Sequence, residues 1–209
     1  MSKDKTFIFI AGVEGSGTTL LLRVLAKLQG SVALGGAFHS KYYALPRWLM
    51  NRITDRLWAF PERPRKKAKY VALLQAIVSA VPGRYVVYKR SYPFNDLSYF
   101  PDVLDFEGFP VPTKVIVLKR ALESNAKSIL RRGFVKTIEE ARIRTDQALS
   151  MLDEQTEKLD ASKLLRLRYE DMIDPAKKHM VLDQIAAFIG CESGELQALA
   201  GMIDKPTGG

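Results

Sequence analysis

The chain has 209 residues, 47% hydrophobic and 26% charged, a composition that fits an ordinary folded protein and excludes a wholly disordered one. Its net charge of +9 favours an anionic partner such as a nucleotide, an acidic glycan or an anionic membrane surface, and no recognisable nucleic-acid-binding motif points to DNA or RNA. Cys191 is the only cysteine, which excludes an intrachain disulfide and favours a reducing, cytoplasmic location.

The amino-terminal part predicts a strand, a glycine-rich turn and a helix in direct succession. Thr6–Ala11 is continuously apolar, as a strand buried on both faces of a parallel sheet is, and it is too short to span a membrane. From Thr18 to Leu28 the apolar residues recur at helical spacing, and Gly30 stands where a C-terminal cap is expected.

Strands and helices continue to alternate along the rest of the chain. Short apolar runs predict strands, and amphipathic segments predict helices. The expected strands are 31–34, 85–89, 114–119 and 164–168, and the expected helices are 70–80, one that ends near 131, 137–159 and 175–189, with Gly190 closing the last. This order predicts a single α/β domain over 1–209, with three layers and a central parallel sheet flanked by helices.

The stretch from about 36 to 70 does not fit this alternation. It holds two tryptophans, several prolines and a basic cluster. We expect an acceptor loop or lid here, with weak contact to a membrane surface or a solvated charged face as the alternatives.

The turn after the first strand has the spacing of a phosphate-binding loop. Gly12 and Gly17 are placed as in a Walker A motif, in which backbone N–H groups and a helix N-terminus surround a phosphate. The residue after Gly17 is Thr18, whereas a kinase or NTPase has a lysine there. Arg120, not an acidic residue, follows the strand 114–119. The loop therefore predicts a P-loop NTPase-like fold but disfavours magnesium-dependent phosphoryl transfer.

The loop residues also match a known family. Gly15, Ser16, Gly17, Thr18 and Thr19 resemble the 5′-phosphosulfate loop of sulfotransferases that use 3′-phosphoadenosine 5′-phosphosulfate (PAPS). This resemblance implies that these five residues bind the donor nucleotide.

Two later segments resemble the same family in the same order. Arg120 at a strand end, followed eight residues on by Ser128, is similar to its 3′-phosphate motif, and a guanidinium can bind phosphate oxygens in a bidentate fashion. Tyr169 begins a Tyr-Glu-Asp segment, whose tyrosine lies near the adenine in the family. The resemblance implies a sulfotransferase that transfers sulfuryl from PAPS to a hydroxyl or amine of a small-molecule or glycan acceptor. It releases 3′-phosphoadenosine 5′-phosphate (PAP) and needs no metal.

The loop departs from the family at one position. Sulfotransferases have lysine or arginine immediately before Ser-Gly-Thr, where this chain has Gly15. Charge on the leaving oxygen still has to be stabilised, so another cation is expected. Lys89, at the end of a neighbouring strand, is the candidate, and Arg90 is the second choice.

The reaction also needs a general base. We expect His39, in a glycine-rich loop after the second strand, with Asp96, Asp102 and Glu107 as rivals. His179 is expected to face solvent on the last helix. Glu14, inside the loop, would repel an anion, so we expect its side chain to point outward or toward the acceptor.

Two other functions remain open at this point. One is a P-loop kinase that acts on a small molecule. The other is a non-catalytic basic module that binds acidic polymers with a steep dependence on salt.

Overall fold

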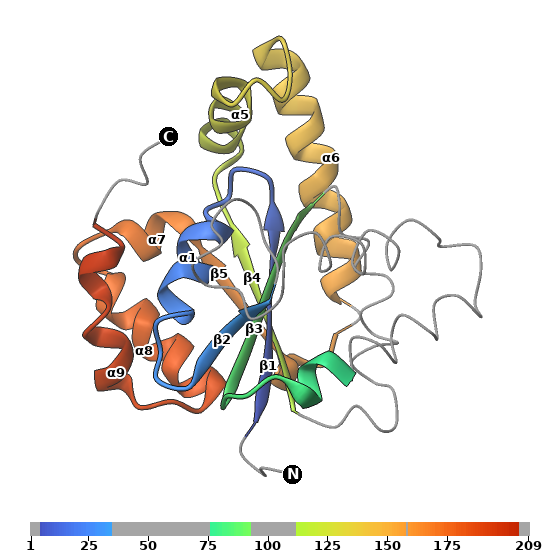
Figure 1. The fold of residues 1–209 in the computed structure, drawn as a ribbon. Helices are drawn as coiled ribbons and strands as arrows, with labels where there is room; N and C mark the ends of the chain where they lie inside the picture. Colours follow the sequence, from blue (N-terminus) through green and yellow to red (C-terminus); the bar gives the residue numbers. More distant parts are fainter. Residues whose placement is uncertain (1–4, 35–75, 93–111, 158, 205–209) are drawn as a thin grey trace.

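The protein is described by a computed structural model that covers residues 5–34, 76–92, 112–157 and 159–204. Its centre is a parallel sheet of five strands (Figure 1): β1 (Thr6–Val13), β2 (Ser31–Leu34), β3 (Tyr85–Tyr92), β4 (Thr113–Lys119) and β5 (Leu164–Arg168). The strands lie in the order β2-β3-β1-β4-β5. Because β1 lies between β3 and β4, the chain crosses over in opposite directions on its two sides, and ligands of such sheets bind at the carboxyl end of this strand.

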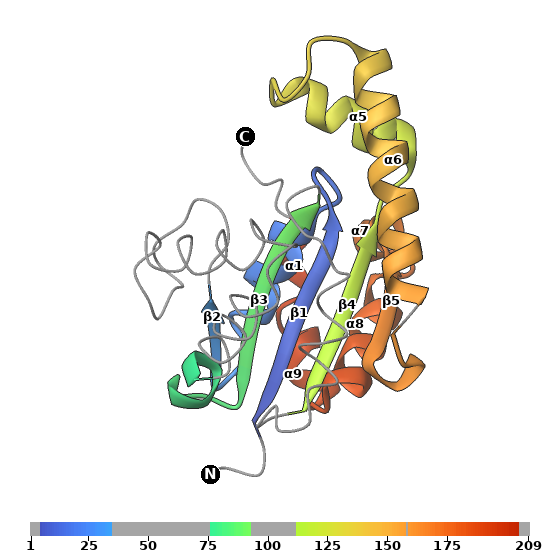
Figure 2. The same ribbon diagram turned by 90° about the vertical axis from the view of Figure 1, so that its right-hand side faces the viewer.

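Helices cover both faces of the sheet, which makes three layers (Figures 1 and 2). One face carries α1 (Thr18–Leu25), α7 (Tyr169–Ile173), α8 (Lys178–Ile189) and α9 (Ser193–Gln197), and the other carries the long α6 (Ile138–Glu157). The shorter α5 (Leu122–Arg131) packs against α6 beyond the carboxyl ends of the strands. Two 3₁₀ turns, η3 (Ala161–Lys163) and η4 (Ala200–Met202), are also present.

The two faces of the sheet build two separate cores. In β1, Ile8 and Ile10 pack toward α1 and α8, whereas Phe7 and Phe9 pack toward α6, and all four are fully buried. Burial of such a side chain contributes about 1.5–3 kcal/mol. This explains why the central strands are continuously apolar.

The structure confirms the α/β fold with a central parallel sheet and changes several boundaries. The helix after the glycine loop ends at Leu25, and its C-cap is Ala26. The prediction that Gly30 caps this helix was wrong: the Gly30 carbonyl accepts hydrogen bonds from the amides of Arg84 and Tyr85 and so joins the turn before β2 to the start of β3. Gly190, with φ +74, does close α8 as expected.

Other predictions extend beyond what the structure describes. Only 76–80 of the helix expected at 70–80 is described, and it is helical. The stretch 36–70, expected to be an acceptor loop or lid, lies outside the described residues. None of the helices that the structure describes has the length and apolar character needed to cross a bilayer.

Candidate functional site

The loop between β1 and α1 is shaped by two glycines in the left-handed region. Gly15 has φ +88 and Gly17, the N-cap residue of α1, has φ +92. No side chain in the described ranges caps α1, and the Gly17 carbonyl accepts from the amides of Leu20 and Leu21. The amides of Thr18 and Thr19 therefore have no partner within the helix, as is typical of a first helical turn that binds an anion.

Neither glycine could carry a side chain in this structure. A Cβ on Gly17 would lie 2.3 Å from Cδ2 of Tyr169. A Cβ on Gly15 would lie 2.4 Å from Oδ1 of Asn125 and 3.2 Å from Oγ of Ser128. The loop therefore packs directly against α7 and α5. The cation that the sulfotransferase loop has at the position of Gly15 would not fit here.

Arg120 connects the three segments singled out in the sequence. Its Nη1 donates a hydrogen bond to the carbonyl oxygen of Gly15 over 3.1 Å. Its guanidinium lies 4.5 Å above the ring of Tyr169, at stacking distance. Glu170, next to this tyrosine, accepts through Oε1 from the amide of Ala121 at 2.9 Å and so fixes the chain on the other side of Arg120.

Several polar groups around Gly15 are buried without a partner among the described residues. Ser16 and Asn125 are fully buried and Ser128 is 5% exposed. The unpartnered atoms are Oγ of Ser16, Oγ of Ser128, both side-chain polar atoms of Asn125, Nε of Arg120 and Oε2 of Glu170. An unpaired buried polar group costs about 1–3 kcal/mol, so such a concentration in one place indicates a site that binds a polar ligand.

Lys89 reaches the same loop from the other neighbouring strand. Side chains alternate along β3, and Tyr85 and Val87 face the α1 side, so Lys89 and Ser91 face it too. Nζ of Lys89, a residue only 7% exposed, donates to Oγ1 of Thr19 over 3.1 Å. The hydroxyls of Thr18 and Ser91 are 3.2 Å apart. The side chain of Arg90, the second choice for the missing cation, lies outside the described part of the chain.

Glu14 points to α6 and pairs with Arg144, whose Nη2 lies 2.7 Å from its carboxylate. Its side chain is only 11% exposed. Burial raises the pKa of Glu14, while Arg144 and, less strongly, Arg132 and Lys89 oppose that rise. The negative charge inside the loop is thus compensated by arginine.

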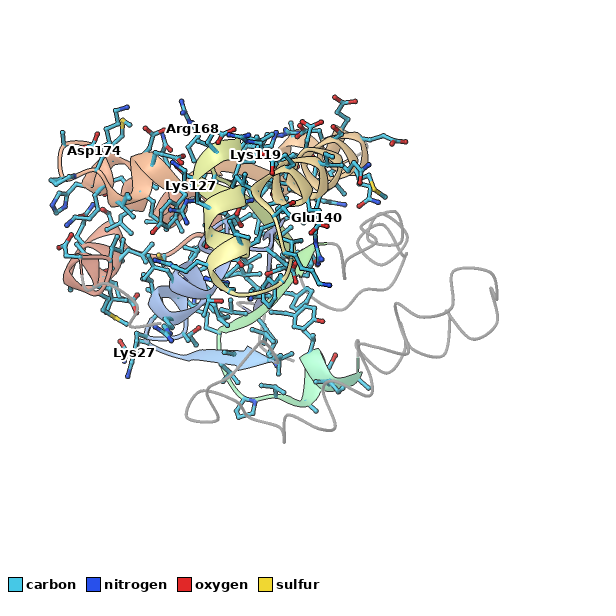
Figure 3. The ribbon with its side chains drawn as sticks, turned by 90° about the horizontal axis from the view of Figure 1, so that it is seen from above. Lys27, Lys119, Lys127, Glu140, Arg168 and Asp174 are labelled. Atoms are coloured by element: carbon cyan, nitrogen blue, oxygen red, sulfur yellow. The ribbon has the colours of Figure 1, made fainter. Side chains whose placement is uncertain are left out.

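The edge of the sheet at which the strands end carries further positive charge. Lys119 and Arg168 are register partners at the carboxyl ends of β4 and β5, and the view from above also shows Lys127, which comes from α5 (Figure 3). Lys119 is paired with Asp153. Such an edge attracts anionic ligands.

The candidates for the general base remain untested. His39, Asp96, Asp102 and Glu107 lie outside the described residues. His179 is exposed on α8, where its side chain contacts that of Gln197 on α9. Within the ranges that the structure describes, no group of three or more His, Cys, Asp and Glu side chains could hold a metal ion.

Sequence reasoning missed some residues that the structure brings to the loop. Asn125 carries a signal that could have found it: it lies three residues before Ser128, on the same face of a helix. Ser91 lies two residues after Lys89, on the same face of a strand. Arg144 has no comparable signal, because its contact with Glu14 depends on how α6 crosses the sheet.

Comparisons with known proteins identify the fold. No known family profile matches the chain, and no curated protein matches it in sequence. Matches do come from solved structures, 140 chains in all. The α/β fold with its five-stranded parallel sheet is similar to that of P-loop NTPases.

The similar structures include sulfotransferases and kinases. The sulfotransferase domain of an olefin synthase from Synechococcus PCC 7002 has a TM-score of 0.58 at 18% identity, covering 100% of this chain and 79% of that domain. A mouse sulfotransferase in complex with PAP has a TM-score of 0.57 at 13% identity, covering 98% of this chain and 65% of the other. A shikimate kinase from Bacteroides thetaiotaomicron has a TM-score of 0.55 at 15% identity, covering 88% of this chain and 98% of the other. The fold alone does not distinguish sulfuryl from phosphoryl transfer.

Proposed function

We propose that the chain is a sulfotransferase, which transfers the sulfuryl group of PAPS to a hydroxyl or amine of a small-molecule or glycan acceptor. One observation carries the proposal. The loop of the first motif and the arginine and serine of the second meet at Gly15, where several of their buried polar atoms have no partner among the described residues. A donor with phosphate groups at both the 5′ and the 3′ position of one ribose would supply partners to both motifs.

The residues fit the two ends of such a donor. The amides of Thr18 and Thr19 and the hydroxyl of Ser16 would bind the 5′-phosphosulfate, since they lie at the N-terminus of α1. Arg120 and Ser128 would bind the 3′-phosphate. Among the described residues Nε of Arg120 has no partner and its Nη1 donates to a backbone carbonyl, so the guanidinium can turn toward an anion. Tyr169 stacks on Arg120 and would lie beside the nucleoside.

The transfer itself requires one displacement at sulfur. The acceptor oxygen or nitrogen forms a bond to sulfur as the bond between sulfur and the bridging oxygen of the 5′-phosphate breaks. The electron pair of that bond stays on PAP, and the proton of the acceptor passes to a base. Lys89 and the loop amides would stabilise the charge that develops on the leaving oxygen, and His39 stays the predicted base.

The residue types beside the loop favour sulfuryl over phosphoryl transfer. A P-loop kinase has a lysine where this chain has Thr18, and an acidic residue that holds magnesium. Here β3 carries Lys89 and ends three residues later, at Tyr92, beyond the end predicted from the sequence. The strand β4 ends in Lys119, which Arg120 follows. Because a sulfuryl group carries less negative charge than a phosphoryl group, amides, hydroxyls and a cation can stabilise its transfer.

Isothermal calorimetry with PAP, and separately with ATP plus magnesium, tests this function. We expect PAP to bind in the micromolar range and ATP with magnesium to bind at least tenfold more weakly. Tighter binding of ATP would replace the proposal with the kinase. Binding of heparin that PAP does not compete with, and that salt weakens steeply, would replace it with the polymer-binding module.

A further inference from the structure

Asn125 is the most deeply buried polar side chain beside the loop that the two phosphate motifs do not include. It lies in the second turn of α5, is fully buried, and has neither its amide nitrogen nor its carbonyl oxygen hydrogen-bonded within the described residues. A carboxamide can make four hydrogen bonds, two as donor and two as acceptor. Leaving all of them unmade in the interior is costly, so its presence needs a reason.

Its position supplies that reason. The side chain lies against Gly15, where a Cβ would come within 2.4 Å of its oxygen, and Ser128 follows one helical turn later on the same face of α5. Arg120 reaches the same glycine from the end of β4. Asn125 therefore lies at Gly15, where the loop meets the residues that would bind the 3′-phosphate.

The missing lysine of the loop is part of the same arrangement. Asn125 fills the space that a Cβ atom at position 15 would occupy. Gly15 and Asn125 are complementary in shape. Where the sulfotransferase loop has a lysine or arginine side chain, this protein therefore has the neutral carboxamide of Asn125, which can both donate and accept hydrogen bonds.

We infer that Asn125 is a nucleotide-binding residue: its amide nitrogen donates to the 3′-phosphate that Arg120 and Ser128 hold, and its oxygen accepts from the 2′-hydroxyl of the same ribose. This rests on the proposed function for the identity of the nucleotide. The 2′-hydroxyl is adjacent to the 3′-phosphate on the sugar, so one carboxamide can contact both. Either orientation of the carboxamide presents one donor group and one acceptor to this pair.

The variants Asn125→Leu and Asn125→Asp test the inference in the full-length chain. Leucine has a similar shape and no unmet hydrogen bonds, so we expect the melting temperature of the ligand-free protein to rise while PAP binds about tenfold or more weakly. Aspartate keeps the shape but places a carboxylate beside the phosphate, so PAP affinity should fall further. Ser31→Ala, which removes a buried unpartnered hydroxyl at the opposite edge of the sheet, should leave PAP affinity unchanged.

A second comparison uses 2′-deoxy-PAP. In the wild type it should bind more weakly than PAP, and in Asn125→Leu the two nucleotides should bind equally. Equal PAP affinity of the wild type and both variants would overturn the inference and leave the proposed function intact. If the wild type binds ATP in place of PAP and Asn125→Leu loses that affinity, the proposed function fails while a nucleotide-binding role for Asn125 stands. A wild type that binds neither nucleotide would overturn both.

Discussion

Lys89, in the second half of β3, donates a hydrogen bond to Thr19 in the first turn of α1, with 3.1 Å between the ammonium nitrogen and the hydroxyl oxygen. This places a nearly buried cation beside the positive end of a helix, where both attract an anion. The contact joins the start of α1, which follows β1 and its loop, to β3, although the two residues are 70 positions apart in the sequence. Lys89 is therefore the candidate for the cation that the loop lacks at Gly15.

Replacing Lys89 should therefore impair catalysis more than binding. We expect Lys89→Met to lower the rate at which PAPS is converted to PAP by about 10²–10³-fold, because charge on the leaving phosphate loses its cation. The affinity for PAP should fall less. Chromatography of PAPS and PAP over time measures the rate, and calorimetry measures the affinity.

Lys114→Met is the matched control, because Lys114 is the second residue of β4, at the amino end of the parallel strands, and donates to the carbonyl of Ser162. Its rate should stay within about twofold of the wild type. A rate for Lys89→Met as high as that of this control would remove Lys89 from the mechanism.

Glu14 should make the stability of the protein depend on pH. Burial raises its folded pKa above the ordinary value of 4.5, so its contribution to stability is fully present below that value and is lost as pH rises through the folded pKa. Glu14→Gln stays neutral, and its melting temperature should rise relative to the wild type as pH increases from about 4 to 7. Thermal unfolding at constant ionic strength measures this difference. The same difference should not appear in the control Glu139→Gln, because the side chain of Glu139 on α6 is 70% exposed. A melting-temperature difference for Glu14→Gln that grows as pH falls would contradict the raised pKa of Glu14.

The substitution Gly17→Ala should destabilise the protein more than Gly133→Ala, although both glycines have a positive φ. Gly133 has φ +71 and open space around it, so Gly133→Ala should cost only the strain of a left-handed alanine, about 1–2 kcal/mol. Gly17→Ala adds a clash with the ring of Tyr169 and should cost clearly more free energy of unfolding in urea. The double variant Gly17→Ala/Tyr169→Ala lacks that ring. Measured against Tyr169→Ala alone, it should lose an amount of unfolding free energy closer to the loss in Gly133→Ala. Equal losses in the two single variants would mean that the loop moves away from α7 freely.

Much of the fold could be predicted because its signals are local. The buried runs around Ile8, Val87 and Ile116 have the length and β-branched character of strands enclosed by helices, and all are strands in the structure. Short helices were harder: α7 and α9 have five residues each, too few to show a helical period. The end of α1 was misplaced, because apolar residues continue past Leu25 into the turn and Leu28 remains buried.

The site could be predicted only as separate pieces. The glycine loop, Arg120, Ser128 and Tyr169 were predicted from spacing and resemblance, but the approach of Arg120 and Ser128 to Gly15 depends on β4 lying directly beside β1 and on α5 turning back over the loop. Both are non-local. The partnership of Glu14 with Arg144 was hidden for the same reason. The base stays a prediction, since His39 lies outside the described residues.

The most direct test of the account is the affinity for PAP relative to 5′-AMP, which lacks only the 3′-phosphate, in the wild type and in Arg120→Ala. Arg131→Ala, at the exposed end of α5, serves as the control. The account predicts that the wild type and the control bind PAP at least about tenfold more tightly than 5′-AMP, because charge-assisted hydrogen bonds are worth about 1.5–3 kcal/mol. Arg120→Ala should lose this preference for PAP, while its affinity for 5′-AMP stays unchanged. A wild type that binds the two nucleotides equally, or an Arg120→Ala variant that keeps the full preference, would contradict the claim that the two motifs bind one nucleotide.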